Sequence, residues 1–265
     1  MQRKKVLMCA PDYYDVVYSI NPWMDRSIAP QIQTAHREWN TLHKTLSQMN
    51  LEIKLIDPQP GCPDLVFTAN AGLVRGNKCV MTRFQHKERQ VEEPFFKEWF
   101  LKEGFEVYEI DHGSFEGEGD ALFAGNTLFA GYGVRTDRAT YQSIAEFLEV
   151  SEIVLCRLTN EHFYHLDTCF CPLDENRALI VMEAFEPASL KLIEQRIELI
   201  PLNENDANAF GCNSVVHEKT IVMPHGCKEI CQELTRLDFE VITIPLGEFK
   251  KAGGSAKCLT LWLEN

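Results

Sequence analysis

The chain has 265 residues, and its 39 acidic and 26 basic side chains give a formal net charge of −13 at pH 7. Hydrophobic residues make up 45% and charged residues 25%, which excludes a disordered tail, a collagen and a coiled coil. An acidic surface of this kind repels phosphate backbones, so we expect no nucleic-acid partner.

The sequence contains no run of about 18 apolar residues, so we expect no membrane partner. A basic cluster near the N-terminus is followed by a short apolar run that ends at Pro11, too short for a signal peptide. We therefore expect a cytoplasmic protein whose ten cysteines are free thiols.

Short strand-like runs with alternating apolar residues recur along the chain, each ending in a polar or proline-containing turn. They are KVLMCAP (5–11), LEIKLIDP (51–58), FEVYEIDH (105–112), EIVLCRL (152–158), IELIPL (197–202) and FEVITIPL (239–246). Each run is followed by further apolar segments that we predict to be strands, among them 64–74 and 167–173.

Five segments with apolar residues at three- to four-residue spacing predict helices: 30–49, 86–104, 139–150, 188–197 and 227–238. There are also five strand groups if 5–11 pairs with the C-terminal KCLTLWLE (257–264). This pattern predicts an α/β fold, a five-bladed α/β propeller with its repeats around a central active site, in a single domain over 1–265. An ordinary α/β sandwich with coincidental spacing is the alternative.

Residues able to carry chemistry fall at one place in each repeat, so radial symmetry would bring them together on the axis. These residues are Asp64, Glu116, Glu118, His165, Asp167, Asn208, Asn213 and Cys258. Residues two positions apart in a strand point to the same face, so His165 and Asp167 should also point the same way.

Cys258 follows the small residues Gly253-Gly254-Ser255-Ala256, which let the backbone pass close to a ligand. A thiolate there could be a nucleophile that a nearby imidazole helps to ionise, with His165 as general acid and base. Several carboxylates beside them would require a cation, and guanidinium matches carboxylates through bidentate hydrogen bonds. The residues therefore predict a cofactor-independent guanidine hydrolase.

A zinc site is the competing interpretation, with Cys169, Cys171, Cys227, Cys231 and the pair His162 and His165 as candidate ligands. The spacing is weak because the sequence contains no pair of cysteines separated by two residues. We predict no metal. For any one cysteine or histidine, an ordinary structural role is the simplest alternative.

The combined motifs resemble the amidinotransferase (pentein) superfamily. They are NPWM (21–24), PDLVFTANAG (63–72), FEGEGDALF (115–123), GYGVR (131–135), FYHLDTCFCPL (163–173), NAFGCNSV (208–215) and KAGGSAKCLTL (251–261). The chain is most similar to the arginine dihydrolase domain of cyanobacterial arginine dihydrolase/ornithine cyclodeaminase proteins, and less so to arginine deiminase and dimethylarginine dimethylaminohydrolase. The resemblance covers nearly the whole chain and implies the five-bladed α/β propeller.

The resemblance also implies roles for individual residues. Cys258 would be the nucleophile, His165 the acid and base, and Glu116 the acid that orients the histidine. The implied substrate-binding residues are Asp64, Asp167 and Asn70 at the guanidine, and Asn21, Asp120 and Arg135 at the amino-acid end. Glu118 and Ser255 depart from the family pattern, which has alanine there, and we expect neither to touch the chemistry.

Together these observations predict a thiol-dependent hydrolase that converts arginine to ornithine, two ammonia and carbon dioxide. Its partner would be a small molecule, arginine or a methylated arginine, and association into homo-oligomers is compatible with the sequence. Alternatives within the family are an arginine deiminase or dimethylarginine dimethylaminohydrolase that releases citrulline, and an amidinotransferase. Outside it stand a zinc hydrolase and a non-catalytic binding propeller.

Overall fold

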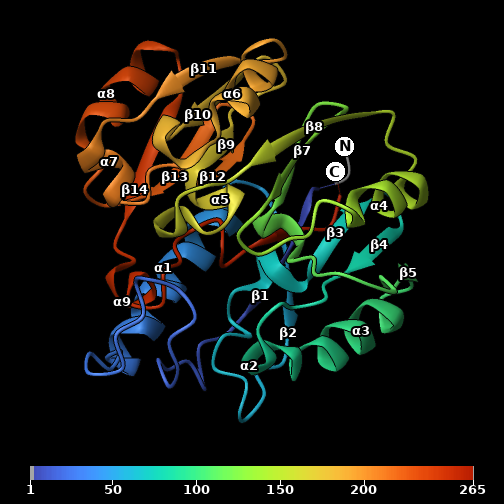
Figure 1. The fold of residues 1–265 in the computed structure, drawn as a ribbon. Coiled ribbons are helices and arrows are strands. Elements are labelled where there is room, and N and C mark those ends of the chain that lie inside the picture. The colour runs from blue at the N-terminus through green and yellow to red at the C-terminus, as the bar shows by residue number, and fades with distance from the viewer. Residues whose placement is uncertain (1–2, 265) are drawn as a thin grey trace.

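The computed structural model describes residues 3–264, whose strands form five three-stranded sheets (Figure 1). The strands of the first sheet lie side by side in the order β15 (Leu261–Trp262), β1 (Lys5–Cys9), β2 (Glu52–Ile56); those of the second in the order β3 (Gly72–Arg75), β4 (Lys78–Met81), β5 (Glu106–Tyr108); and those of the third in the order β6 (Ala121–Ala124), β7 (Thr127–Tyr132), β8 (Glu152–Arg157). The order in the fourth is β9 (Phe170–Pro172), β10 (Arg177–Ile180), β11 (Glu198–Pro201), and in the fifth it is β12 (Val215–His217), β13 (Thr220–Pro224), β14 (Glu240–Ile244).

All five sheets share one pattern. The middle strand pairs antiparallel with one neighbour and parallel with the other. A helical segment connects the two parallel strands, because parallel neighbours need a crossover. These connecting helices are α1 (Ile32–Gln48), α2 (Lys87–Gln90) with α3 (Glu93–Lys102), α4 (Thr140–Leu148), α6 (Pro187–Glu194) and α8 (Lys228–Arg236). The predicted mixed α/β fold with five repeats is therefore present.

The remaining helices are short, and all of them except η4, which lies between β10 and β11, are outside these crossovers. They are the α-helices α5 (Leu166–Cys169), α7 (Glu204–Asn208) and α9 (Gly247–Lys250), and the 3₁₀ turns η1 (Thr68–Ala71), η2 (Gly117–Gly119), η3 (Glu161–Phe163) and η4 (Met182–Ala184).

The first and last strands of the chain belong to the same sheet, as the sequence predicts. β1 and β15 are antiparallel, with Val6 opposite Trp262 and Leu7 opposite Leu261. The described ends of the chain accordingly lie close together, with Lys5 Nζ 3.1 Å from Glu264 Oε1.

Three local predictions are wrong. Residues 64–71 form turns and η1 instead of a strand, and 166–169 form α5, so strand alternation does not orient Asp64, His165 or Asp167. The sequence 64–71 is buried at every position, so its apolar residues do not mark one face of a strand. The single helix predicted over 86–104 is split in two, with Pro94 in the first turn of α3. Proline favours this place because it needs no amide donor there.

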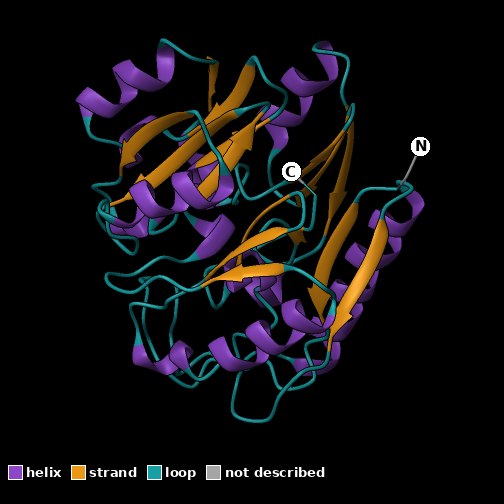
Figure 2. Cartoon of the chain, turned by 90° about the vertical axis from the view of Figure 1, so that its right-hand side faces the viewer, coloured by secondary structure: helices purple, strands orange, loops and turns teal. Residues whose placement is uncertain are grey.

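Apolar side chains of successive units pack against each other in four buried clusters. One joins the first and second sheets, one the second and third, one the third, fourth and fifth, and one the fifth and first. Figure 2 shows helices toward the outside of the molecule and the sheets further inside. The segments that precede β3, β6, β9, β12 and β15 carry most of the predicted site residues, whereas Asn21 precedes α1 and Arg135 follows β7.

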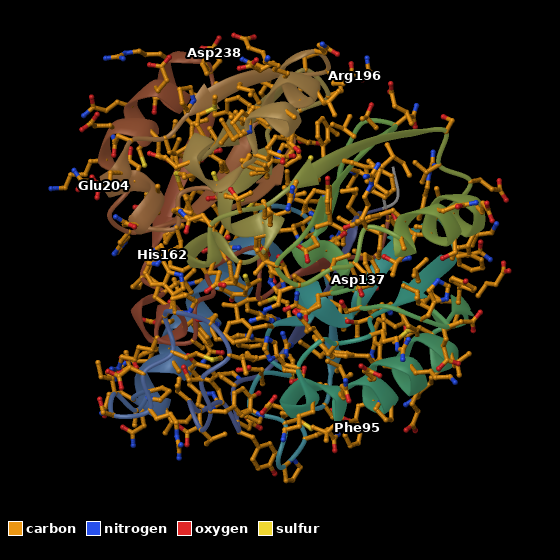
Figure 3. All side chains as sticks on the ribbon, in the orientation of Figure 1. Phe95, Asp137, His162, Arg196, Glu204 and Asp238 are labelled. Atoms are coloured by element: carbon orange, nitrogen blue, oxygen red, sulfur yellow. The ribbon has the colours of Figure 1, made fainter. Side chains whose placement is uncertain are left out.

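The surface carries charged side chains. Arg196 and Asp238 are exposed at the rim of the view in Figure 3. Within residues 3–264, no helix has the length and apolar character needed to cross a membrane.

Candidate active site

The predicted nucleophile Cys258 is buried and has two polar partners. Its Sγ lies 3.2 Å from Asp167 Oδ2 and 3.0 Å from Asn213 Nδ2. Asn213 Oδ1 also accepts hydrogen bonds from the backbone amides of Ser255 and Cys258, so one amide side chain holds the whole turn. Burial raises the pKa of the Cys258 thiol well above its usual value, and the Asp167 carboxylate adds to the effect. The polar partners of the thiol are therefore a carboxylate and an amide, where the sequence predicted an imidazole.

The predicted acid and base, His165, is tied to Glu116. His165 Nε2 lies 2.7 Å from Glu116 Oε2, and the same oxygen accepts a hydrogen bond of 3.0 Å from Arg135 Nη1. Burial opposes ionisation of Glu116, but Arg135 and His165 outweigh it and hold the pKa of this carboxyl well below its usual range. An ionised Glu116 fixes the imidazole through Nε2 and leaves Nδ1 for chemistry.

Three buried polar atoms around this centre have no hydrogen-bond partner among the described residues: Asp64 Oδ1, Asp167 Oδ1 and His165 Nδ1. Burial raises the pKa of Asp64, although Arg89 and a hydrogen bond of 2.9 Å from the Tyr18 hydroxyl oppose it. Burial also raises the pKa of Asp167 to about 6. Unpaired buried acceptors are costly, so this set is suited to a ligand that carries several N–H donors.

Asn70 lies between the acidic cluster and a buried cation that sequence reasoning missed. Its Nδ2 donates to the Glu116 carbonyl at 3.0 Å, and its Oδ1 accepts from Arg89 Nη1 at 2.7 Å. Arg89 also donates to the Asp64 carbonyl and pairs with Glu92. Arg89 lies in the predicted helix 86–104 and in the motif RFQHKERQVEEPFFKEWF (83–100), which also resembles the family, but neither gave it a role.

A small cavity of about 10 Å³ lies beside Cys258. It is lined by Ile20, Asn21, Met24, Asp64, Phe67, Asn70, Arg89, Arg135, Tyr164, Ala252 and Cys258. Ile20, Asn21 and Met24 belong to an irregular segment that covers the site. The carbonyl of Ile20 accepts from Arg135 Nη2, and Asn21 donates to the Ala252 carbonyl.

Two glycines let the backbone approach these side chains. A Cβ on Gly119 would lie 2.4 Å from Asn70 Nδ2 and 3.1 Å from His165 Nδ1. Gly253 has φ of +83°, and a Cβ there would lie 2.9 Å from Asn21 Oδ1. The small-residue run before Cys258 therefore allows the close backbone approach that the sequence predicted.

The other predicted residues lie apart from this cavity. Asp120 is buried behind it, and its two oxygens accept from the Thr136 hydroxyl and the Leu166 amide. Burial raises the pKa of Asp120 to about 6. Asn208 is exposed. The Glu118 carboxylate pairs with Lys257 and lines a different cavity.

The ten cysteines are all free, and those proposed as zinc ligands bond to backbone carbonyls or to Met223. In the part of the chain that the structure describes, no three His, Cys, Asp or Glu side chains are placed to hold a metal ion. The described donor atoms therefore give no support to the zinc interpretation.

Comparison with known proteins identifies relatives along the whole chain. The family model for N,N-dimethylarginine dimethylhydrolase, eukaryotic, matches residues 19–263. The bifunctional arginine dihydrolase/ornithine cyclodeaminases AgrE of Nostoc sp. and ArgZ of Synechocystis sp. are each 47% identical over 98% and 97% of this chain. The chain spans only 38% and 37% of their lengths. An N(G),N(G)-dimethylarginine dimethylaminohydrolase of Mycobacterium tuberculosis is 34% identical over 97% of this chain and 85% of its own.

Solved structures agree with these relationships. The N-terminal domain of ArgZ covalently bound to a reaction intermediate superposes with a TM-score of 0.95 at 45% identity, covering 99% of this chain and 98% of that one. The dimethylarginine dimethylaminohydrolase of Pseudomonas aeruginosa shares the fold, with a TM-score of 0.84 at 20% identity over 99% of this chain and 100% of the other. The chain therefore belongs to the dimethylarginine dimethylaminohydrolase family of the amidinotransferase superfamily, as its motifs predict.

Proposed function

We propose that this chain is a cysteine-dependent hydrolase that attacks the guanidinium carbon of arginine and releases ornithine, two ammonia and carbon dioxide. One observation carries the proposal: Asp64 Oδ1, Asp167 Oδ1 and His165 Nδ1 are buried without partners among the described residues, and of these side chains Asp167 contacts the Cys258 thiol and Asp64 lines the same cavity as Cys258. A guanidinium group supplies the N–H donors and the positive charge that these acceptors lack. The likeness to AgrE and ArgZ, whose names state arginine dihydrolase activity, supports the same substrate.

In this proposal Asp64 and Asp167 hold the guanidinium and Cys258 is the nucleophile. Burial and Asp167 raise the pKa of the Cys258 thiol, and the arriving cation opposes them by stabilising the thiolate. The thiol proton passes to His165 Nδ1, the sulfur adds to the guanidinium carbon, and ammonia leaves with that proton, which gives a thiouronium. The same imidazole then activates water, which adds to the thiouronium and expels the thiolate. Glu116 keeps the ring oriented through Nε2.

This first cycle yields citrulline, and a second attack on the bound ureido carbon with a second water yields ornithine, ammonia and carbon dioxide. Asn70 supports the second cycle because its amide adjoins the site and can hold the ureido group. Arg89 holds Asn70 Oδ1, which leaves one Nδ2 hydrogen to face the ligand. Release of citrulline is the second candidate, favoured by the family model and by the dimethylarginine dimethylaminohydrolases among the relatives.

Roles at the amino-acid end of the substrate follow from the cavity walls. Arg135 lines the cavity beside Asn21 and carries a charge suited to the α-carboxylate. Arg89 is a second cation on the same wall. Asp120 would reach the α-ammonium only if it exchanged its bonds to Thr136 and Leu166 for a substrate bond.

We also infer that the five units close into a propeller and form one domain. The pairing of β1 with β15 and the clusters that join each unit to the next support closure. The ten free thiols support a reducing compartment such as the cytoplasm.

Incubation of the protein with arginine, followed by amino-acid analysis and ammonia quantification, tests the function. Ornithine with two ammonia per arginine supports the dihydrolase, whereas stoichiometric citrulline supports the deiminase. Parallel reactions with dimethylarginine, with added glycine and with a chelator test the demethylating hydrolase, the amidinotransferase and the zinc hydrolase. The Cys258→Ser variant is the control, and equal turnover in that variant would overturn the proposal.

A further inference from the structure

A second and larger cavity lies behind the segment that carries Cys258. Its volume is about 480 Å³, and both Lys257 and Glu118 line it. Cys258 lines the small cavity of the candidate active site. The consecutive residues Lys257 and Cys258 therefore line two different cavities, on opposite sides of their backbone segment.

Lys257 and Glu118 form a buried ion pair in this wall. Lys257 Nζ lies 2.7 Å from Glu118 Oε2, with only 8% and 3% of the two side chains exposed. Lys257 Nζ also donates to the Thr260 carbonyl, and Glu118 Oε2 accepts from the Trp262 amide. Replacement of a buried ion pair by apolar residues is often neutral or stabilising, so stability alone does not explain its presence.

Asn213 and Cys258 link the segment of Lys257 to Asp167. The Lys257 amide donates to the Asn213 carbonyl at 3.2 Å, Asn213 Nδ2 donates to the Asp167 carbonyl at 3.1 Å, and the Cys258 thiol bonds to Asp167 Oδ2. Burial raises the pKa of Asp167, Lys257 opposes this as the largest favourable charge, and Glu118 reinforces it more weakly. The titratable and charged groups that interact with Asp167 are Lys257, Cys258, Glu118, Tyr164, Cys169 and Cys212, together with Cys171. Of these groups, Lys257 alone is a cation.

We propose that Lys257 and Glu118 are positioning residues that set the charge of Asp167 from the cavity opposite the substrate. Lys257 keeps the carboxylate ionised and ready to bind a guanidinium, and Glu118 limits how strongly it does so. The functional consequence rests on the proposed function, whereas the electrostatic one does not. Glu118 thus acts on the site from the larger cavity, without lining the small one.

Two isosteric variants test the proposal because they act in opposite directions. Lys257→Met removes the cation, so Asp167 should titrate at higher pH by roughly one unit. Glu118→Gln removes the anion and keeps a hydrogen-bond acceptor for Lys257, so Asp167 should titrate at lower pH. The titration is followed by NMR of protein labelled at the aspartate carboxyl carbon, with the Asp167 signal assigned from Asp167→Asn. The acidic limb of kcat/KM for arginine should move with each titration.

Matched controls separate this role from a purely structural one. Lys257→Arg keeps the charge and should restore the wild-type titration. Lys97→Met and Glu109→Gln break an exposed ion pair of 2.5 Å between α3 and the segment after β5, and should leave the Asp167 signal unmoved.

The outcomes are distinct. Unshifted Asp167 titration in both variants, or shifts of the same sign, would overturn the proposal. If Lys257→Met does not fold, the downward shift in Glu118→Gln decides alone. Opposite shifts in a protein that does not hydrolyse arginine would support the positioning role and refute the proposed function.

Discussion

Arginine binding should weaken sharply as the pH falls below 6, because a guanidinium needs an ionised Asp167. The Cys258→Ser variant allows binding to be measured without turnover, and its hydroxyl can replace the thiol as a donor to Asp167 Oδ2. Burial raises the pKa of the Asp167 carboxyl to about 6. It is therefore about 9% ionised at pH 5 and about 91% ionised at pH 7, which predicts about tenfold tighter binding at pH 7.

The sign follows from linkage. The bound cation favours the carboxylate and lowers the pKa of Asp167, so the protonated fraction of Asp167 loses its proton on binding. This fraction is large below pH 6 and small above it, so fewer protons are released as the pH rises. Asp64, whose pKa is also raised, adds to the slope in the same direction. Isothermal titration calorimetry between pH 5 and 7.5, in two buffers of different ionisation enthalpy, measures both the affinity and the proton release.

Asp167→Asn in the same background is the control. It should bind arginine more weakly at pH 7 and with a flatter pH dependence, because only Asp64 remains to titrate. Affinity that does not change between pH 5 and 7 in the Cys258→Ser protein would show that neither carboxylate faces the guanidinium, and would refute the clamp.

The remaining predictions concern single residues. Cys258→Ser should lose nearly all turnover, and a haloacetamidine should label Cys258 in preference to the other thiols, as peptide mass spectrometry would show. Asp64→Asn should lower kcat/KM for arginine at least about tenfold, the loss of one charged hydrogen bond, and unchanged kinetics would contradict this. Asn70→Ser should shift the product from ornithine to citrulline while the first ammonia is still released, as amino-acid analysis would show. Glu116→Gln should lower the free energy of unfolding at pH 7 by about 3–5 kcal/mol, because Arg135 stays buried without its anion; an unchanged denaturation midpoint would contradict this.

The sequence predicted the repeat but not the local geometry of the site. The alternating apolar residues correctly predicted strands that belong to the five sheets. The predicted pairing of 5–11 with the C-terminal segment is also confirmed. The segment from Asp64 failed because all of its residues are buried, so its apolar residues carry no information about which face a side chain occupies. Asn70 nevertheless lines the site, placed by η1 and by its bond to Arg89.

Residues that act through tertiary contacts were the hardest to predict. Arg89 and Lys257 are basic residues, which are usually exposed, and nothing in their neighbouring residues marks them as buried. Only the fold brings Arg89 to Asn70 and Lys257 to Glu118, across 19 and 139 positions of sequence. The motif residues were identified because chemistry restricts their type, whereas these partners depend on where distant segments meet.

The pairing of β1 with β15 also has a consequence for the order of folding. Val6 must wait for Trp262, so the first sheet is completed only after residue 262 has left the ribosome. The four other sheets need no residue beyond Ile244. Cys258 precedes β15 by only three positions, so the proposed nucleophile arrives together with the strand that completes the first sheet. Closing so long a loop is slow, so a nascent chain would hold the four other sheets before β15 docks and brings Cys258 into place.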